Sequence, residues 1–180
     1  MKVLVDMDGV LADFEGYLIQ RWEQLYPDSY KIRPEERKHF YISRQLPKEW
    51  RPKLYQIMYA REFFASLPPI PGGKEALNEM RALGWQVHIC SSPLIENRTG
   101  ASEKFAWVEE HLGRDWVGDL ILTSDKTLVR GDVLIDDRPE LNGVETPTWE
   151  HVLYDQVYNR RVKGKRRLTW ENWKEVLLES

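Results

Sequence analysis

The sequence predicts an α/β protein built on a parallel sheet, and three observations support this class. Short apolar runs of β-forming residues recur along the chain, amphipathic helical segments separate them, and glycines follow the helices. Alternation of buried strands with helices is typical of a parallel sheet with helices on both faces. In such sheets the functional site lies at the carboxyl ends of the strands.

The first element is an apolar strand at residues 3–5. It leads into Asp6 and Asp8, whose spacing of two places both carboxylates on one face of extended chain. Gly9 then allows the backbone to turn. Burying two adjacent carboxylates costs free energy unless a cation or a shared proton compensates. The pattern indicates either a metal or phosphoryl site, or a surface turn with two capping aspartates.

The segment that follows, to about residue 70, does not fit the alternation. It contains helix-compatible pieces at 17–26 and 51–61 and is rich in aromatic residues. The aromatic residues are Phe40, Tyr41, Tyr55, Tyr59, Phe63 and Phe64. Most of these rings are expected to form the core of this segment, and some are available for stacking on a planar ligand.

Two amphipathic helices are predicted after this segment. The first covers 74–83, where apolar residues recur at helical spacing. The second covers 102–112 and places Phe105, Val108 and Leu112 on one face. Each is followed by a glycine, the residue that most readily ends a helix.

Four further strands are predicted from short apolar runs at 86–90, 120–123, 133–135 and 151–154. Polar residues follow the strands. They are Asp6 and Asp8 after the first, Ser91 and Ser92 after the second, Asp125 and Lys126 near the third, and Asp136 and Asp137 after the fourth. Each pair alone is explained by a turn or a solvated ion pair. Four such pairs at four strand ends favour one shared site.

This constellation suits phosphoryl transfer. Asp6 and Asp137, with the backbone carbonyl of Asp8, offer oxygen ligands to Mg²⁺. A phosphate monoester brings about −1.5 to −2 charges at neutral pH, so Mg²⁺ alone leaves the site negative. Lys126 supplies positive charge, and the hydroxyl and backbone N–H of Ser91 can hold phosphoryl oxygens.

Several motifs occur in a recognisable order. They are D-M-D-G-V-L-A-D-F at 6–14, P-I-P-G at 69–72, I-C-S-S-P at 89–93, I-L-T-S-D-K-T at 121–127, L-I-D-D-R-P at 134–139, and the segments 147–153 and 170–177. In this order they resemble the haloacid dehalogenase (HAD) superfamily of phosphatases, and more narrowly its 5'(3')-deoxyribonucleotidases. The resemblance spans nearly the whole chain. It implies a HAD-like Rossmannoid three-layer parallel sheet.

The resemblance also implies a catalytic mechanism. Asp6 is the nucleophile that forms an aspartyl-phosphate, and Asp8 protonates the leaving alkoxide and then activates water. Both residues contribute to the Mg²⁺ site together with Asp137.

Phosphate binding is assigned by the resemblance to Ser91, Ser92 and Lys126. By the same resemblance, Asp136 supports the site. These roles agree with the charge argument made from the residues.

The family inserts a small helical cap after the first strand, which closes over the site and contacts the nucleoside. We therefore expect one unit with its core at 1–14 and 71–180 and the cap at 15–70. Phe14, Phe40 and Tyr41 match the aromatic pocket of the family. The chain departs from the family near Met58, where relatives carry a larger aromatic residue. A (deoxy)nucleoside monophosphate is the expected substrate, with pyrimidine deoxynucleotides preferred.

Two other functions remain open on the sequence. One is a phosphatase of the same superfamily that acts on a sugar phosphate or a nucleic-acid end. The other is a non-enzymatic phospho-receiver, which also uses strand-end aspartates, a lysine and Mg²⁺. A receiver carries its phosphorylated aspartate after the third strand, whereas here the acidic pair comes first and an insertion interrupts the alternation.

The amino-acid composition limits the classes of partner that the protein can bind. The chain has 180 residues with 26 basic and 29 acidic side chains, so a net charge of −3 provides no general attraction to nucleic acid or to anionic membranes. The single cysteine excludes an internal disulfide, and no apolar run approaches the roughly 18 residues that cross a bilayer. We expect a soluble cytoplasmic protein without a signal peptide. The family resemblance suggests a homodimer.

Overall fold

The computed structural model describes residues 1–179, and its centre is a six-stranded sheet in which all paired strands run parallel. The strand order is β3-β2-β1-β4-β5-β6. The strands are β1 (Lys2–Val5), β2 (Gln86–Ser91), β3 (Leu120–Leu122), β4 (Val133–Asp136), β5 (Glu150–Tyr154) and β6 (Arg167–Leu168). The predicted α/β class with a parallel sheet is confirmed, and the two-residue strand β6 is an addition that the apolar runs did not indicate.

Strand β1 lies at the middle of the sheet because its side chains are apolar on both faces. Val3 and Val5 are fully buried on one face and Leu4 on the other. The strand pairs with β2 and β4, with Val5 opposite both Ile89 and Ile135. This register brings the residues after β1, β2 and β4 to the same edge of the sheet.

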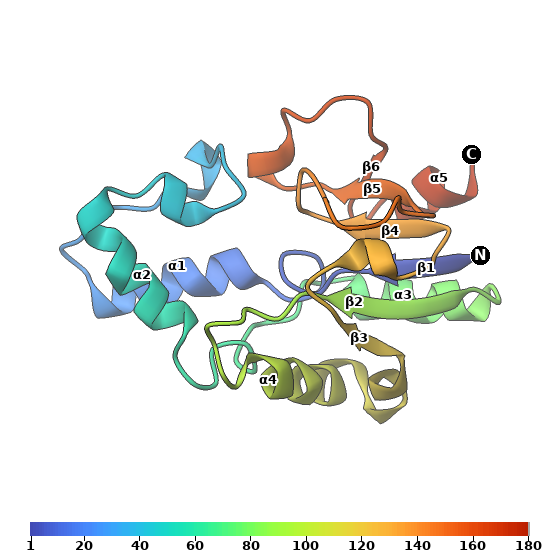
Figure 1. Ribbon diagram of the computed structural model, residues 1–180, viewed down its shortest axis with the longest axis horizontal. Helices are drawn as coiled ribbons and strands as arrows, with labels where there is room; N and C mark the ends of the chain where they lie inside the picture. Colours follow the sequence, from blue (N-terminus) through green and yellow to red (C-terminus); the bar gives the residue numbers. More distant parts are fainter. Residues whose placement is uncertain (180) are drawn as a thin grey trace.

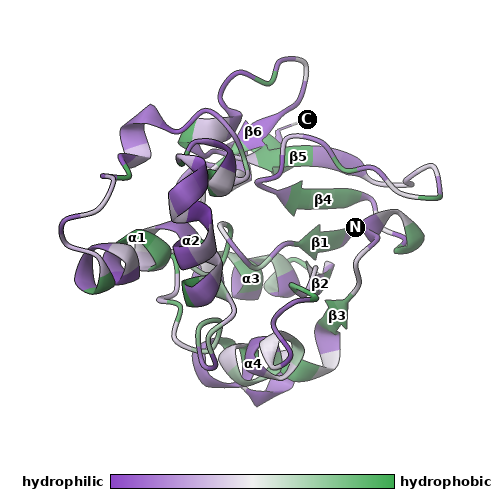
Figure 2. Cartoon of the chain, turned by 60° about the vertical axis from the view of Figure 1, so that its left-hand side comes forward, coloured by the Kyte–Doolittle hydropathy of each residue, from purple (hydrophilic) through white to green (hydrophobic). Residues whose placement is uncertain are grey.

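The two faces of the sheet are covered unequally. The larger hydrophobic cluster joins Val3 and Val5 to the helices α3 (Gly73–Ala82), α4 (Gly100–Trp107) and α5 (Trp173–Leu178). The other face carries a small cluster around Leu4, Cys90, Leu134 and Trp149, covered by the connections that follow β3 and β4. The apolar strands stand out against the more polar surfaces of the helices in Figure 2. No helix within residues 1–179 is long and apolar enough to cross a membrane.

Helix α3 matches the predicted helix, but the predicted face of the second helix is wrong at Phe105. The α-helix ends at Trp107 and continues as a π-turn over Val108–Leu112, which shifts the register of the side chains. Phe105 is 40% exposed, whereas the buried positions of α4 include Glu103, Lys104 and Trp107. Glu103 and Lys104 are polar but face the core. The spacing of the apolar residues therefore predicted the wrong buried face for this helix.

The inserted segment contains two α-helices beyond the carboxyl ends of the strands (Figure 1). Helix α1 (Phe14–Leu25) begins at Asp13, whose carboxylate accepts a hydrogen bond from the N–H of Gly16 at 2.9 Å. Helix α2 (Arg51–Met58) follows three short 3₁₀ turns. Leu18, Trp22 and Leu54 are fully buried and belong to the same cluster as the sheet residues. The insertion and the core thus share one hydrophobic interior.

Glu103 ties the end of the insertion to α4. Its buried carboxylate accepts hydrogen bonds from the backbone N–H groups of Glu62, at 2.8 Å, and Phe64, at 2.9 Å. Glu62 has a positive φ of 67°, a conformation that few non-glycine residues adopt. The carboxylate therefore holds the chain in this conformation where it returns from the insertion to the core.

Replacing Glu103 by alanine is expected to lower the free energy of unfolding by about 2 to 4 kcal/mol, because the buried N–H of Phe64 and the partly buried N–H of Glu62 lose a charged acceptor. Glu110→Ala, an exposed change in the π-turn after α4, serves as the control and should change stability by less than about 0.5 kcal/mol. Urea unfolding followed by circular dichroism measures both. Equal losses in the two variants would contradict the assigned role of Glu103.

Candidate active site

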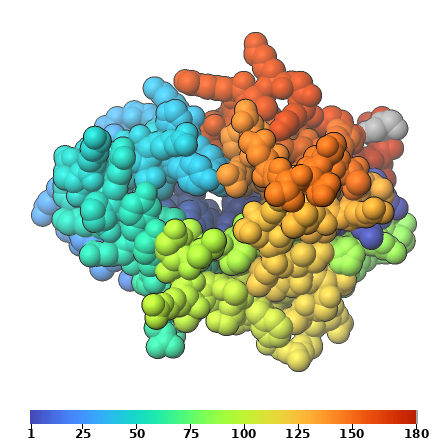
Figure 3. Space-filling view, in the orientation of Figure 1, coloured from blue at the N-terminus to red at the C-terminus, as the bar shows by residue number. Residues whose placement is uncertain are grey.

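A cavity of about 560 Å³ lies between the carboxyl edge of the sheet and the insertion. Figure 3 shows the hollow between the insertion, coloured blue to cyan, and the core, coloured green to orange. The sheet side of the lining includes Asp6, Asp8, Ser92, Lys126, Asp136 and Asp137. The other side includes Phe14, Phe40 and Tyr41. The structure therefore brings together all but one of the predicted site residues around a single cavity.

The exception is Ser91, which does not line the cavity but lies directly beside it at the end of β2. Its side chain is buried, and its hydroxyl oxygen has no hydrogen-bond partner among the described residues. A buried hydroxyl group is normally paired, so the hydroxyl of Ser91 retains an unused capacity for hydrogen bonding next to the cavity.

Lys126 joins two of the carboxylates. Its Nζ lies 2.6 Å from Oδ1 of Asp6 and 2.6 Å from Oδ2 of Asp136. Burial alone would lower the pKa of Lys126, but the carboxylates of Asp136 and Asp6 outweigh this effect and raise it above its ordinary value. The ammonium group therefore stays charged. The Asp6 side chain keeps 12% of its surface exposed, beside the cavity.

Asp136 and Asp137 are adjacent in sequence but differ in what their oxygens do. Asp136 accepts from Lys126 through one oxygen and from the backbone N–H of Arg138, at 2.8 Å, through the other. Asp137 accepts from the hydroxyl of Tyr158 through Oδ2, while its buried Oδ1 has no hydrogen-bond partner among the described residues. Both oxygens of Asp136 therefore have hydrogen-bond partners, whereas Oδ1 of Asp137 can still accept a bond.

This arrangement fits a divalent cation. One oxygen from each of Asp6, Asp136 and Asp137 lies within 4.8 Å of the others. Burial, followed by the charges of Asp136 and Asp6, raises the pKa of Asp137 well above its ordinary value. A hard cation with oxygen ligands would bind the unpartnered Oδ1 of Asp137 and would offset the charge of the crowded carboxylates.

Asp8 has a partner that the sequence analysis missed. Its Oδ2 lies 2.6 Å from Nζ of Lys104, a lysine whose side chain is 0% exposed. The aliphatic stem reaches from α4 past Phe64, whose ring centroid is 4.7 Å from the ammonium nitrogen. Lys104 follows Gly100 by four residues and precedes Trp107 by three on the buried stripe of α4. The face predicted through Phe105 does not include this position, so apolar periodicity gave no signal for it.

The pKa of Asp8 is raised by burial, which outweighs the opposing charge of Lys104. Its second oxygen, Oδ1, is buried without a hydrogen-bond partner among the described residues. Asp8 thus has one oxygen fixed by Lys104 and one oxygen free. A carboxyl group with a raised pKa and a free oxygen beside a cavity is suited to donate and accept a proton.

The insertion side of the cavity is organised around Arg37, another residue that sequence reasoning missed. Its buried guanidinium donates to Oε1 of Glu15 at 3.0 Å and to the backbone carbonyl of Phe40 at 3.0 Å. Across the cavity, Arg138 donates to the hydroxyl of Tyr41 at 3.0 Å. These bonds hold the rings of Phe40 and Tyr41 at the cavity.

Asp125, which the sequence placed near the third strand end, has a structural role. Its carboxylate accepts from the backbone N–H groups of Thr127, at 2.9 Å, and Val144, at 2.9 Å. These bonds fix the turn that carries Lys126 and do not involve the cavity. The hydrogen bond from the Thr127 hydroxyl, followed by those from the backbone N–H groups, lowers the pKa of Asp125.

Comparisons with known proteins agree with this geometry. A protein of Bordetella pertussis is 49% identical over 98% of this chain and 95% of its own length. The human cytosolic 5'(3')-deoxyribonucleotidase is 43% identical over 98% of this chain and 93% of its own. A HAD family hydrolase from Deinococcus radiodurans, solved with bound phosphate and sodium, covers 99% of this chain and 95% of its own with a TM-score of 0.62. At 18% identity that structure supports the fold alone.

The model of the family described as "5' nucleotidase, deoxy (Pyrimidine), cytosolic type C protein" matches residues 1–179. The resemblance inferred from the motifs is therefore confirmed over the described chain. Together with the identities to the bacterial and human relatives, this match shows that the chain belongs to the 5'(3')-deoxyribonucleotidase family of phosphoric monoester hydrolases.

Proposed function

We propose that this protein is a Mg²⁺-dependent phosphomonoesterase that dephosphorylates deoxynucleoside monophosphates through an aspartyl-phosphate intermediate. The observation that carries the proposal is the pairing of two aspartates with two buried lysines at one edge of the cavity. Lys126 contacts Asp6 and Lys104 contacts Asp8, at 2.6 Å in each case. The two carboxylates therefore have different partners, which suits them to different chemical roles.

In the first step, a carboxylate oxygen of Asp6 attacks phosphorus and the ester bond to the nucleoside oxygen breaks. Asp8 donates its proton to that leaving oxygen, which would otherwise depart as an unstable alkoxide. In the second step, Asp8 takes a proton from water, which attacks phosphorus and releases inorganic phosphate from Asp6. Asp8 regains the proton that it donated, so the cycle balances.

Phosphoryl oxygens would be held by the hydroxyl groups of Ser91 and Ser92 and by the ammonium group of Lys126. Asp6, Asp137 and the backbone carbonyl of Asp8 would hold Mg²⁺, and Asp136 would orient Lys126. When bound, Mg²⁺ neutralises charge on the phosphoryl group as it is transferred. The insertion acts as a cap that limits access of water to the intermediate.

The cap side of the cavity favours a nucleoside over a simple sugar phosphate. Phe14, Phe40 and Tyr41 line it, and an aromatic ring can stack on any of the bases. The names of the human relatives also specify deoxyribonucleotides. We therefore assign Phe14, Phe40 and Tyr41 to the contacts with the base.

Replacing the nucleophile provides the first test of the mechanism. Asp6→Asn is expected to lower turnover by at least about 10³-fold, because the amide lacks the nucleophilic oxygen while its volume is nearly the same. Wild-type enzyme quenched during turnover of ³²P-labelled deoxynucleotide should carry a hydroxylamine-sensitive label that Asp6→Asn lacks. Labelled Asp6→Asn protein would contradict the assignment. A label that persists for minutes in the wild type without phosphate release would indicate a receiver.

The roles of Asp8 and Lys104 are tested with two leaving groups. In single turnovers, Asp8→Asn is expected to slow release of thymidine from dTMP by about 10²- to 10⁴-fold. Release of p-nitrophenolate from p-nitrophenyl phosphate should slow far less, because this leaving group needs no proton. Lys104→Met removes the group that fixes one oxygen of Asp8 but leaves the proton donor in place, so it should show a smaller selective loss. Lys74→Met, an exposed change on α3, should show none. Equal losses for both leaving groups would exclude the proton-donor role.

Substrate choice is tested with specificity constants for dUMP, dTMP, dGMP and UMP. We expect pyrimidine deoxynucleotides to be preferred, and UMP to be disfavoured by about 1 to 3 kcal/mol because its 2'-hydroxyl would be left unpaired against an apolar wall. Met58→Phe should lower the constant for dGMP relative to dTMP by filling the cavity at Met58. Equal constants for UMP and dUMP, or a larger constant for dGMP than for dTMP, would contradict these expectations.

A further inference from the structure

Tyr158 contacts both sides of the cavity, although no strand end or motif indicated it. It lies in the 3₁₀ turn Val157–Asn159 after β5 and is 8% exposed. On the core side, its hydroxyl donates to Oδ2 of Asp137. On the cap side, the guanidinium carbon of Arg37 lies 5.1 Å from the centroid of its ring, and the Phe40 ring packs edge-on at 5.9 Å.

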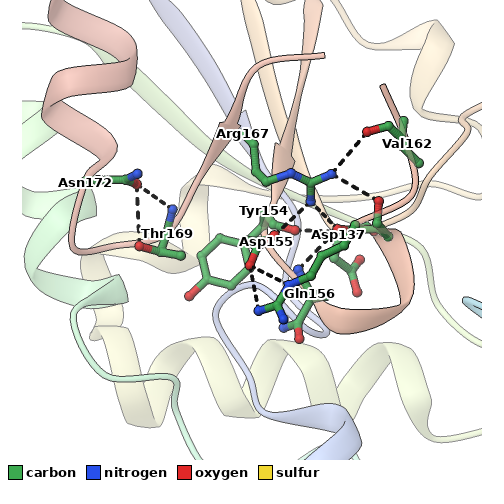
Figure 4. Close-up of polar contacts among 10 residues, drawn as sticks. Asp137, Tyr154, Asp155, Gln156, Val162, Arg167, Thr169 and Asn172 are labelled. Carbon is green, nitrogen blue, oxygen red and sulfur yellow. Dashed lines mark hydrogen bonds and ion pairs between the residues drawn. The ribbon is translucent and has the colours of Figure 1, made fainter. Parts of the chain in front are cut away.

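The turn that carries Tyr158 is fixed to the core on several sides. The side-chain amide of Asn159 donates to the backbone carbonyls of Asp137, at 2.7 Å, and Tyr154, at 2.8 Å. Gln156 donates to the carbonyl of Gly9 at 2.8 Å. Figure 4 shows Arg167 reaching from β6 to Asp155 and to Val162, on either side of the turn. The position of the Tyr158 ring is therefore set by the core and not by the cap.

The hydroxyl of Tyr158 determines which oxygen of Asp137 is free. A carboxylate can rotate about its terminal bond and exchange its two oxygens. Here Oδ2 is held by Tyr158, and Oδ1 is left buried without a partner among the described residues. A Cβ on Gly9 would lie 2.3 Å from Oδ2 of Asp137 and 3.2 Å from the Tyr158 hydroxyl, so the glycine of the first motif leaves the space that this pair occupies.

The ring of Tyr158 supports the loop of the cap that contains Phe40. Arg37 stacks on the ring and also holds the carbonyl of Phe40 and the side chain of Gln45, each at 3.0 Å. The stacked guanidinium and the edge of Phe40 are attracted to an aromatic face. Loss of the ring would remove the surface on which this loop rests.

We propose that Tyr158 is a positioning residue with two separable contributions: its hydroxyl orients Asp137 for the cation, and its ring positions the base-binding loop of the cap through Arg37 and Phe40. The inference rests on the proposed function for the identity of the two ligands. It adds a direct physical link between the metal site and the nucleoside site.

The test separates the two contributions with Tyr158→Phe, which removes only the hydroxyl, and Tyr158→Leu, which removes the ring as well. Tyr154→Phe is the matched control, because it removes a buried tyrosine hydroxyl from β5 outside the cavity. Asp137→Asn is the reference for a damaged metal site. Binding of Mn²⁺ is measured by electron paramagnetic resonance without substrate, and binding of thymidine is measured by calorimetry.

Tyr158→Phe is expected to raise the Kd for Mn²⁺ by about 10-fold, as for other side chains that orient metal ligands. Its Kd for thymidine should stay within about twofold of the wild type, because the ring remains. Tyr158→Leu should raise both constants, that for thymidine by roughly 5-fold. Tyr154→Phe should change neither.

An unchanged Kd for Mn²⁺ in Tyr158→Phe, with weakened binding in Asp137→Asn, would overturn the role of the hydroxyl. An unchanged Kd for thymidine in Tyr158→Leu would overturn the role of the ring. If Tyr158→Phe weakens Mn²⁺ binding while the wild type releases no phosphate from dTMP, the proposed substrate is wrong and the role of the hydroxyl stands.

Discussion

The site depends on how the charge of four carboxylates, three of them buried and that of Asp8 partly buried, is balanced at one edge of the sheet. Lys126 contacts Asp6 and Asp136, and Lys104 contacts Asp8, all at 2.6 Å. With every group ionised, two negative charges remain uncompensated among the four carboxylates and two lysines. Burying unpaired charge is costly, so the site favours a divalent cation or protonation of its carboxylates. Burial is the largest cause of the raised pKa values of Asp6, Asp8 and Asp137, ahead of the charges of their neighbours.

The close packing of these groups explains why the first motif carries aspartate at positions 6 and 8 and glycine at position 9. Asp6 lies beside Lys126, and Asp8 two residues later lies beside Lys104, so the two carboxylates are polarised by different cations. Gly9 turns the chain with a φ of 78° and leaves room for the side chains of Asp137 and Tyr158. A side chain at this position would be strained in its backbone and would also collide with Asp137.

The parts of the site at strand ends could be predicted because strand periodicity and parallel pairing determine where those residues go. Asp6 and Asp137 are examples. Lys104 could not be predicted from apolar periodicity, since a lysine at a core position is costly without a buried partner and the partner lies 96 residues away in sequence. Arg37 lies in irregular chain and Tyr158 in a short 3₁₀ turn, and the positions of both depend on tertiary contacts. The unequal layers and the two-residue strand β6 are likewise set by packing and not by local pattern.

The composition of the cap side limits how sharply a substrate can be selected. Phe14 packs against Phe63 with ring centroids 5.5 Å apart, and Tyr55 stacks on Tyr59 at 5.6 Å, so these lining rings are each supported by a second ring. Met58 lines the same cavity with a flexible thioether that adapts to ligand shape. Apolar walls reject an added hydroxyl or a poorly fitting group by only about 10- to 200-fold, because they leave few protein hydrogen bonds to be broken. Under the proposed function, a pocket of this kind suits a class of nucleotides that share a phosphate and a sugar, with the chemistry proposed for Asp6 and Asp8 common to all of them.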